Sequence, residues 1–226
     1  GNYPESTRLA LEKAIAAGAD MIELDCQMTQ DGHVVIFHDE KLRRTAGGRG
    51  ALRDKTLAQL KKLDIGRWRG KAFAGERILT LEEGLEILAG KVDLCLEFKT
   101  FGAATPGLDL KILFTLSHYD YLDRTILSSF DYHCLTRLRD HAPEAVLGII
   151  YGAAVREDPF EAARRLGAAS IHVQKELATR DFLRQAWDEG LDIHVWTVNE
   201  VREMRAFAAL GIQGLISDFP EKFGRL

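Results

Sequence analysis

The sequence has few cysteines, little excess charge of either sign and no long hydrophobic run. Its 226 residues include only Cys26, Cys95 and Cys134, a sparse and odd set that excludes a disulfide scaffold and favours a reducing compartment. We therefore expect a cytoplasmic protein, and we find no signal peptide. The longest apolar run, residues 145–155, is too short for a membrane-spanning helix, which needs ~20 residues.

The overall charge is nearly balanced, which excludes nucleic-acid binding through a general excess of positive charge. The chain has 30 Lys and Arg against 34 Asp and Glu, a net charge of -4. Hydrophobic residues make up 46% and charged residues 28%, which is typical of a globular protein and excludes a disordered chain. We therefore expect no nucleic-acid partner.

Short apolar runs alternate along the chain with longer helical patterns, and this alternation predicts parallel strands joined by crossover helices. We predict an α/β protein, a (β/α)8 TIM barrel forming one domain over residues 1–226, with its first strand upstream of Gly1. An open doubly wound sheet is the alternative. We prefer the barrel because the sequence has no glycine-rich phosphate loop after an early strand, where a doubly wound sheet would have one. The expected strands are 21–27, 92–98, 125–129, 145–150, 170–173, 192–197 and 214–217; the expected helices are 6–18, 81–88, 109–117, 132–141, 159–166, 179–189 and 200–210.

Residues 41–78 interrupt the alternation, and we interpret them as a small insertion after the second barrel strand, near the mouth where barrels place their active sites. Residues 41–71 contain eleven Lys and Arg against two acids, a net charge of +9. One interpretation is a positive field that attracts an anionic substrate or makes peripheral contact with an anionic membrane surface. The other is a solvated helical face without a partner.

Three acidic residues are expected to meet inside the barrel. Side chains alternate along a strand, so Glu23 and Asp25 share one face, and Glu97 and Lys99 share a face of the next strand. Because their neighbours on each strand are apolar and must face the helices, these charged side chains should point inwards. Hard oxygen ligands favour Mg²⁺ or Ca²⁺, so we predict a divalent cation held by Glu23, Asp25 and Glu97. An ion-pair network with Lys99 is the alternative.

A histidine is expected beside these acids. Asp31-Gly32 is typical of a two-residue hairpin turn, and pairing across such a turn sets His38 opposite Asp25. Directly opposed side chains lie with their Cβ atoms ~5 Å apart. An imidazole in that position exchanges protons near neutral pH, so we predict that His38 is catalytic.

Trp196 ends an expected strand. An aromatic side chain at a barrel mouth can form one wall of a substrate pocket, and core packing is an equally good explanation. His194, on the same face, and Cys95, on the face of Glu97, are expected to fill the interior.

Together these residues resemble the glycerophosphodiester phosphodiesterase family over essentially the whole chain. The motif set and its order are specific, although a single motif such as Asp-Gly is not. The matching stretches are residues 4–7, 18–25, 29–32, 38–39 with Leu42 and 44–45, 63–66, 80–83, 96–99, 196–199 and 214–220.

The resemblance implies a TIM barrel that cleaves glycerophosphodiesters, with a divalent metal, to glycerol 3-phosphate and an alcohol. It implies that the metal ligands are Glu23, Asp25 and Glu97 and that His38 is one of two acid/base histidines. It also implies that Lys99 lies near the phosphate, Trp196 in the substrate pocket and Glu5 close to the site.

The chain departs from the family at its start, because the family's first strand ends in His-Arg-Gly and neither His nor Arg is present here. We expect that strand upstream of Gly1, since its loss would open the barrel and expose sheet edges. The alternatives are a phospholipase D-like enzyme acting on lysophospholipids, a non-catalytic phosphodiester-binding relative, and, more remotely, an unrelated barrel enzyme such as a sugar-phosphate isomerase.

Overall fold

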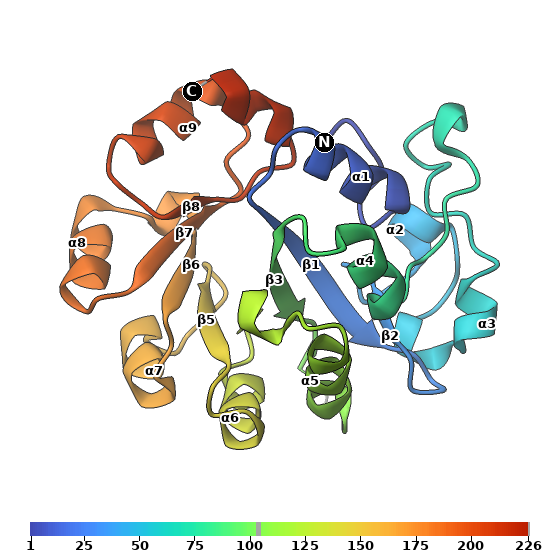
Figure 1. Ribbon diagram of the computed structural model, residues 1–226, viewed down its shortest axis with the longest axis horizontal. Helices are drawn as coiled ribbons and strands as arrows, with labels where there is room; N and C mark the ends of the chain where they lie inside the picture. Colours follow the sequence, from blue (N-terminus) through green and yellow to red (C-terminus); the bar gives the residue numbers. More distant parts are fainter. Residues whose placement is uncertain (103–104, 226) are drawn as a thin grey trace. The chain divides into compact units, whose positions relative to one another are not determined.

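The computed structural model describes residues 1–102 and 105–225, which fall into two compact units, Gly1–Thr125 and Ile126–Leu226 (Figure 1). Strands and helices alternate in the second unit. Among the described residues, no helix combines the length and the apolar character needed to cross a bilayer.

The strands of the first unit are hydrogen-bonded in the order β2-β1-β3. Strands β1 and β3 are parallel, and β2 pairs with β1 in the antiparallel direction. Its strands are β1 (Met21–Met28), β2 (Val34–Ile36) and β3 (Asp93–Phe98); its helices are α1 (Arg8–Ala16), α2 (Arg43–Ala46), α3 (Leu57–Leu60), α4 (Leu81–Leu88) and α5 (Leu108–His118), with 3-10 turns η1 (Leu52–Asp54), η2 (Lys71–Phe73) and η3 (Leu122–Arg124).

The second unit contains parallel strands in the order β4-β5-β6-β7-β8, with helices α6 to α9 in the connections (Figure 1). Helix α7 begins with Asp158 as its cap and Pro159 at its first position, a sequence suited to starting a helix. The elements are β4 (Thr125–Ser129), α6 (Tyr132–His141), β5 (Val146–Tyr151), α7 (Pro159–Leu166), β6 (Ser170–Gln174), η4 (Lys175–Leu177), α8 (Arg180–Asp188), β7 (Asp192–Trp196), α9 (Val201–Ala208), β8 (Gly214–Leu215) and η5 (Pro220–Arg225).

The α/β fold class predicted from the sequence is confirmed, and each expected strand and helix is present with small shifts at its ends. Helix α4 begins with a capping box, as the sequence pattern of Thr80 with Glu83 three residues later indicates: the Thr80 hydroxyl accepts from the Glu83 amide, and the Glu83 carboxylate accepts from the Thr80 amide. The single domain, the upstream first strand and the insertion at 41–78 stay predictions.

The predicted hairpin register is wrong by one residue. Cys26 pairs with Ile36 and Met28 with Val34, so Asp25 is level with Phe37 rather than with His38. The physical reason is a three-residue loop, in which the Thr29 amide bonds the His33 carbonyl and Gly32 adopts a φ of 80°. Loops of this length with a left-handed glycine shift the pairing relative to a two-residue turn.

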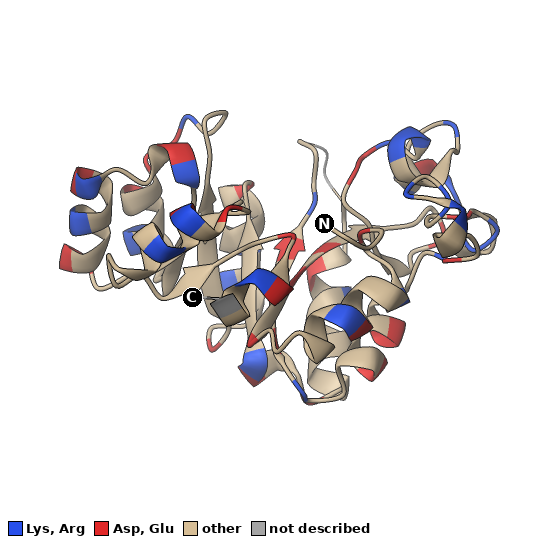
Figure 2. Ribbon diagram, turned by 90° about the horizontal axis from the view of Figure 1, so that it is seen from above, with Lys and Arg blue, Asp and Glu red and all other residues tan. Residues whose placement is uncertain are grey.

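Residues 41–78 are a packed segment with their own apolar contacts, and they contain short helices in place of strands. Leu42, Leu52, Leu60 and Ile65 are buried in one cluster with Val35 and Phe37. Many of the cationic side chains lie outside this cluster, and Lys and Arg are concentrated on the corresponding ribbon at the right of Figure 2. The segment therefore combines a defined conformation with a basic outer surface.

Candidate active site

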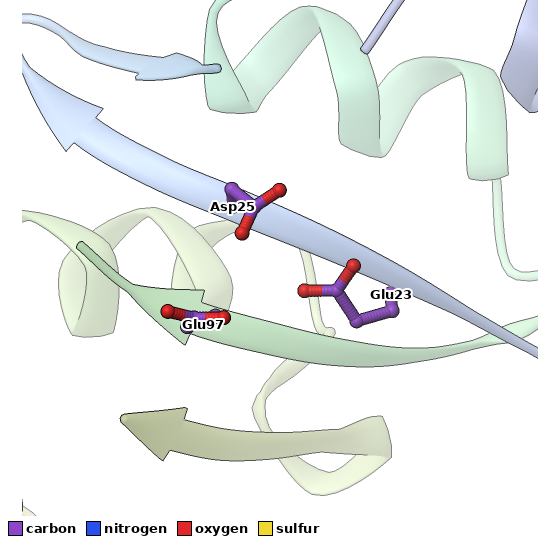
Figure 3. A group of neighbouring side chains, drawn as sticks. All are labelled: Glu23, Asp25 and Glu97. Atoms are coloured by element: carbon purple, nitrogen blue, oxygen red, sulfur yellow. The ribbon is translucent and has the colours of Figure 1, made fainter. Parts of the chain in front are cut away.

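Three carboxylates converge on one face of the sheet in the first unit. Glu23 and Asp25 come from β1 and Glu97 from β3, where Asp25 and Glu97 are partners in the parallel register (Figure 3). Each of the three has a carboxylate oxygen that lies within 4.8 Å of such an oxygen of the other two. Asp25 and Glu97 are buried, and Glu23 is more accessible. Strand alternation and register thus bring the predicted acids together.

Lys99 joins this cluster at the end of β3. Its ammonium lies 3.0 Å from Asp25 Oδ1 and 2.6 Å from Glu97 Oε1. Burial opposes the lysine's charge, but Asp25 and Glu97 outweigh burial and raise the pKa of Lys99. Burial also raises the pKa of Glu97 to about 7, with the charge of Lys99 acting against this rise and that of Asp25 adding to it. The cluster is thus strongly charged and mostly shielded from water.

The composition of the cluster fits a divalent cation. Three carboxylates and one ammonium leave an excess of two negative charges when all four groups are ionised, and close like charges destabilise one another in a buried place. An oxygen-only donor set without thiolate or imidazole is the kind that Mg²⁺ and Ca²⁺ prefer. Glu23, Asp25 and Glu97 are therefore suited to holding such an ion, with Lys99 beside it.

His38 follows β2, and its side chain is about half exposed. Its Nδ1 lies 2.8 Å from Asp39 Oδ1, a contact that favours the tautomer with the proton on Nδ1 and leaves Nε2 free for proton exchange. His38 directly follows Phe37, whose amide donates to the carbonyl oxygen of Asp25 at 2.9 Å. His38 therefore lies near the acidic cluster, although not through the register predicted from the turn.

Arg44 holds Asp39 in place. The guanidinium Nε donates to Asp39 Oδ2 at 2.6 Å and Nη2 to Asp39 Oδ1 at 2.8 Å, and its outer edge donates two bonds of 2.6 and 2.7 Å to Glu5. The guanidinium is the main cause that lowers the pKa of Asp39. Glu5 thus binds Arg44, and a chain of hydrogen bonds from Glu5 through Arg44 and Asp39 holds the His38 imidazole in position.

Gln27 fixes the backbone on either side of His38, a role that the sequence analysis missed. Its buried side-chain amide donates to the carbonyl oxygens of Phe37 at 2.6 Å and Asp39 at 2.9 Å. Strand alternation places Gln27 on the face of Glu23 and Asp25, and this signal was sufficient to mark it as part of the site. The hydrogen bonds of Arg44 to Glu5 could not be predicted from any local sequence pattern, because the two residues are 39 positions apart.

Trp196 belongs to the second unit, at the end of β7. Its Nε1 donates to the His172 carbonyl at 2.9 Å, and its ring contacts Phe130 edge-on at a centroid distance of 5.7 Å. His194 is buried and stacks on His172 at 4.6 Å, in keeping with the expected interior position. Cys95 is also buried.

Comparison with known proteins supports one family throughout. Residues 1–222 match the model of the glycerophosphoryl diester phosphodiesterase family. A glycerophosphodiester phosphodiesterase of Caldanaerobacter subterraneus is 37% identical over 97% of this chain and 90% of its own.

Solved structures agree with the sequence matches. A phosphodiesterase of Oleispira antarctica, in complex with the product sn-glycerol-3-phosphate, superposes with a TM-score of 0.91 at 28% identity, covering 100% of this chain and 92% of its own. A glycerophosphodiester phosphodiesterase of Agrobacterium tumefaciens gives a TM-score of 0.86 at 25% identity over 99% of this chain and 94% of its own. The chain therefore belongs to the glycerophosphoryl diester phosphodiesterase family.

Proposed function

We propose that this enzyme uses a divalent cation to hydrolyse glycerophosphodiesters to glycerol 3-phosphate and an alcohol. The observation that carries the proposal is the convergence of Glu23, Asp25 and Glu97 on one sheet face, near a histidine whose Nδ1 is bound by a carboxylate. The product complex of the Oleispira antarctica relative supports glycerol 3-phosphate as a product here.

In this proposal Glu23, Asp25 and Glu97 hold the cation, which when bound neutralises negative charge on the phosphodiester oxygens. Lys99 adds a second positive charge, and its bonds to Asp25 and Glu97 fix its ammonium within the cluster. Preorganised charges of this kind stabilise a transition state in which negative charge develops on phosphate.

His38 transfers protons through Nε2. Asp39 orients the ring and stabilises its cationic form, and Arg44 keeps Asp39 ionised and in position. The proton comes from the attacking hydroxyl or goes to the departing alkoxide. The attacking group is water or the neighbouring glycerol hydroxyl, and the second route passes through a cyclic phosphate.

The test is phosphodiesterase activity of the full-length protein on glycerophosphocholine and glycerophosphoethanolamine. Chelator treatment should abolish turnover and added Mg²⁺ or Ca²⁺ should restore it. Glu97→Gln should lower kcat by roughly 10²-fold or more because a ligand oxygen and its charge are lost. The exposed α1 residue Glu12 provides the control, and Glu12→Gln should behave as wild type.

Three results would contradict the proposal. Full activity of Glu97→Gln would remove the metal assignment. Turnover of lysophosphatidylcholine alone would indicate the phospholipase D-like alternative. Binding of glycerophosphodiesters without turnover would indicate a non-catalytic relative.

The basic segment has a surface suited to contact with lipid. We infer that residues 41–78 bind the surface of an anionic membrane, because Arg49, Arg67 and Lys71 are exposed there. Trp68 lies between these cations in the sequence with 41% of its surface exposed, and tryptophan favours the interface between water and lipid.

A further inference from the structure

An open pocket of about 620 Å³ lies beside the candidate catalytic histidine in the first unit. His38 forms part of its wall, and the rest comes from residues 39–41, 43 and 44 and from Phe101. A ligand part bound in this pocket would contact the imidazole that we propose to transfer protons. The pocket is therefore placed to receive one of the two groups esterified to the phosphate.

The acidic side chains around the pocket have ion-pair partners, whereas two of the cationic ones have none among the residues that the structure describes. Arg44 neutralises Asp39 at 2.6 Å, and Arg53 lies 3.4 Å from Glu40, so both acids of the wall have a cationic partner. Lys41 and Arg43 are exposed and have no ion-pair partner in residues 1–102 and 105–225. The pocket therefore offers two uncompensated positive charges beside His38.

We propose that this pocket binds the alcohol part of the glycerophosphodiester and selects alcohols that carry a further negative charge, such as a phosphate or carboxylate group. Beyond the shared phosphate, the glycerol part carries no charge in any such substrate, so it would offer Lys41 and Arg43 no further anionic group if it occupied the pocket. The alcohol is the part that varies in charge. The inference rests on the proposed function and specifies its substrate class.

The size of the preference follows from the exposure of the two cations. A charge pair ~4 Å apart in water contributes about 1 kcal/mol, which corresponds to roughly fivefold in a rate or binding constant. Reversing one of the two charges replaces an attraction by a repulsion, so the effect is about tenfold after partial screening by salt. Raising the ionic strength should weaken the preference for the same reason.

The experiment compares three diesters with the full-length protein and its divalent cation present. Glycerophosphocholine releases a cationic alcohol, glycerophosphoglycerol a neutral one, and glycerophosphoglycerol phosphate an anionic one. We expect kcat/KM of the wild type to rise from the cationic to the anionic alcohol at low salt, and this ranking to flatten at high salt. The wild-type comparison needs no substitution and so does not depend on a variant that folds.

Arg43→Glu and Lys41→Glu then locate the preference. Each should lower the ratio of kcat/KM for the anionic over the neutral alcohol by about tenfold. Lys62→Glu is the matched control, because Lys62 is exposed on the same basic segment and does not line the pocket. It should change the ratio by less than about threefold.

Two outcomes would overturn the inference while leaving the proposed function intact. One is turnover of all three diesters by the wild type without a preference for the anionic alcohol. The other is an equal change of the ratio in Arg43→Glu and Lys62→Glu, which would indicate a general field rather than this pocket. Absence of turnover with every diester would instead contradict the proposed function itself.

Discussion

Asp39 links the His38 imidazole to the Arg44 guanidinium. Its carboxylate binds the imidazole Nδ1 on one side and the Arg44 guanidinium on the other. The charge on Asp39 is maintained because Arg44 lowers the pKa of its carboxyl group. Orientation and charge stabilisation of His38 thus depend on Asp39, whose carboxylate is bound by both the imidazole and the guanidinium.

We predict that Asp39→Asn lowers kcat roughly 10²-fold with little change in KM, because the imidazole loses the partner that fixes its tautomer and stabilises its charge. Steady-state kinetics on glycerophosphocholine checks this split, and the melting temperature should move little. The control is Asp54→Asn, an exposed acid of the same segment. A rise in KM with unchanged kcat would show that Asp39 serves binding instead.

His172 and His194 form a buried stacked pair in the second unit, with Ser170 Oγ 2.9 Å from His172 Nε2. Burial lowers the pKa of His172 well below its usual value of 6.5, and the neighbouring His194 adds to this effect. Burial also lowers the pKa of His194, with Asp192 acting in the opposite direction. Both rings therefore stay neutral in the folded protein at pH values where an unfolded chain is protonated.

We predict that the free energy of unfolding falls as the pH drops below 6.5. These two histidines bind protons in the unfolded chain but not in the folded one in this range, at a cost of up to about 1.4 kcal/mol per pH unit for each histidine kept neutral. Urea unfolding at pH 7.5 and 5.5 measures the slope. His172→Phe should reduce the slope, and the exposed control His141→Gln should not; equal slopes in all three proteins would exclude the pair as its source.

At the scale of elements, helix α4 connects the basic segment to the sheet. The Thr80 and Glu83 capping box fixes its first turn, and Glu83 also binds the Lys61 ammonium of the segment. Gly84 packs closely against β2: a Cβ there would lie 2.4 Å from Ile36 Cδ1, so the end of the Ile36 side chain would have to shift. The first residues of α4 thus contact both the basic segment, through Lys61, and β2, through Ile36.

We predict that Thr80→Ala lowers the free energy of unfolding by about 1 kcal/mol, since the Glu83 amide loses its side-chain acceptor. Denaturant unfolding measures the change. Thr80→Ser keeps the hydroxyl and should lose clearly less stability. Equal losses in both variants would show that the methyl group, rather than the cap, matters at this position.

At the scale of the whole molecule, the charge distribution is strongly uneven. Residues 41–71 have a net charge of +9 in a chain whose net charge is -4. Cationic surfaces attract anionic lipid at roughly 1 kcal/mol per residue near the surface. The segment therefore supplies the electrostatic part of the membrane contact proposed above.

We predict that the protein sediments with phosphatidylglycerol vesicles but not with phosphatidylcholine vesicles, and that salt releases it. Arg67→Glu with Lys71→Glu should weaken this binding by at least about tenfold. The reversal of exposed Lys91, which lies outside the segment, is the control. Binding to both kinds of vesicle, or binding that resists salt, would contradict an electrostatic contact through residues 41–78.

The sequence by itself determined the elements and the faces on which their charged side chains lie. Alternation along β1 and β3 sufficed to group Glu23, Asp25, Glu97 and Lys99, because the two faces of a buried strand differ so strongly in polarity. The capping box at Thr80 can likewise be recognised from the sequence, because its hydrogen bonds join residues only three positions apart.

Only the tertiary structure decided how His38 is held. A three-residue hairpin loop displaced it from the position opposite Asp25, and bonds of Arg44 to a residue 39 positions away completed its support. Loop closure and long-range ion pairs depend on which surfaces pack together, whereas side-chain alternation depends only on the backbone of a single strand.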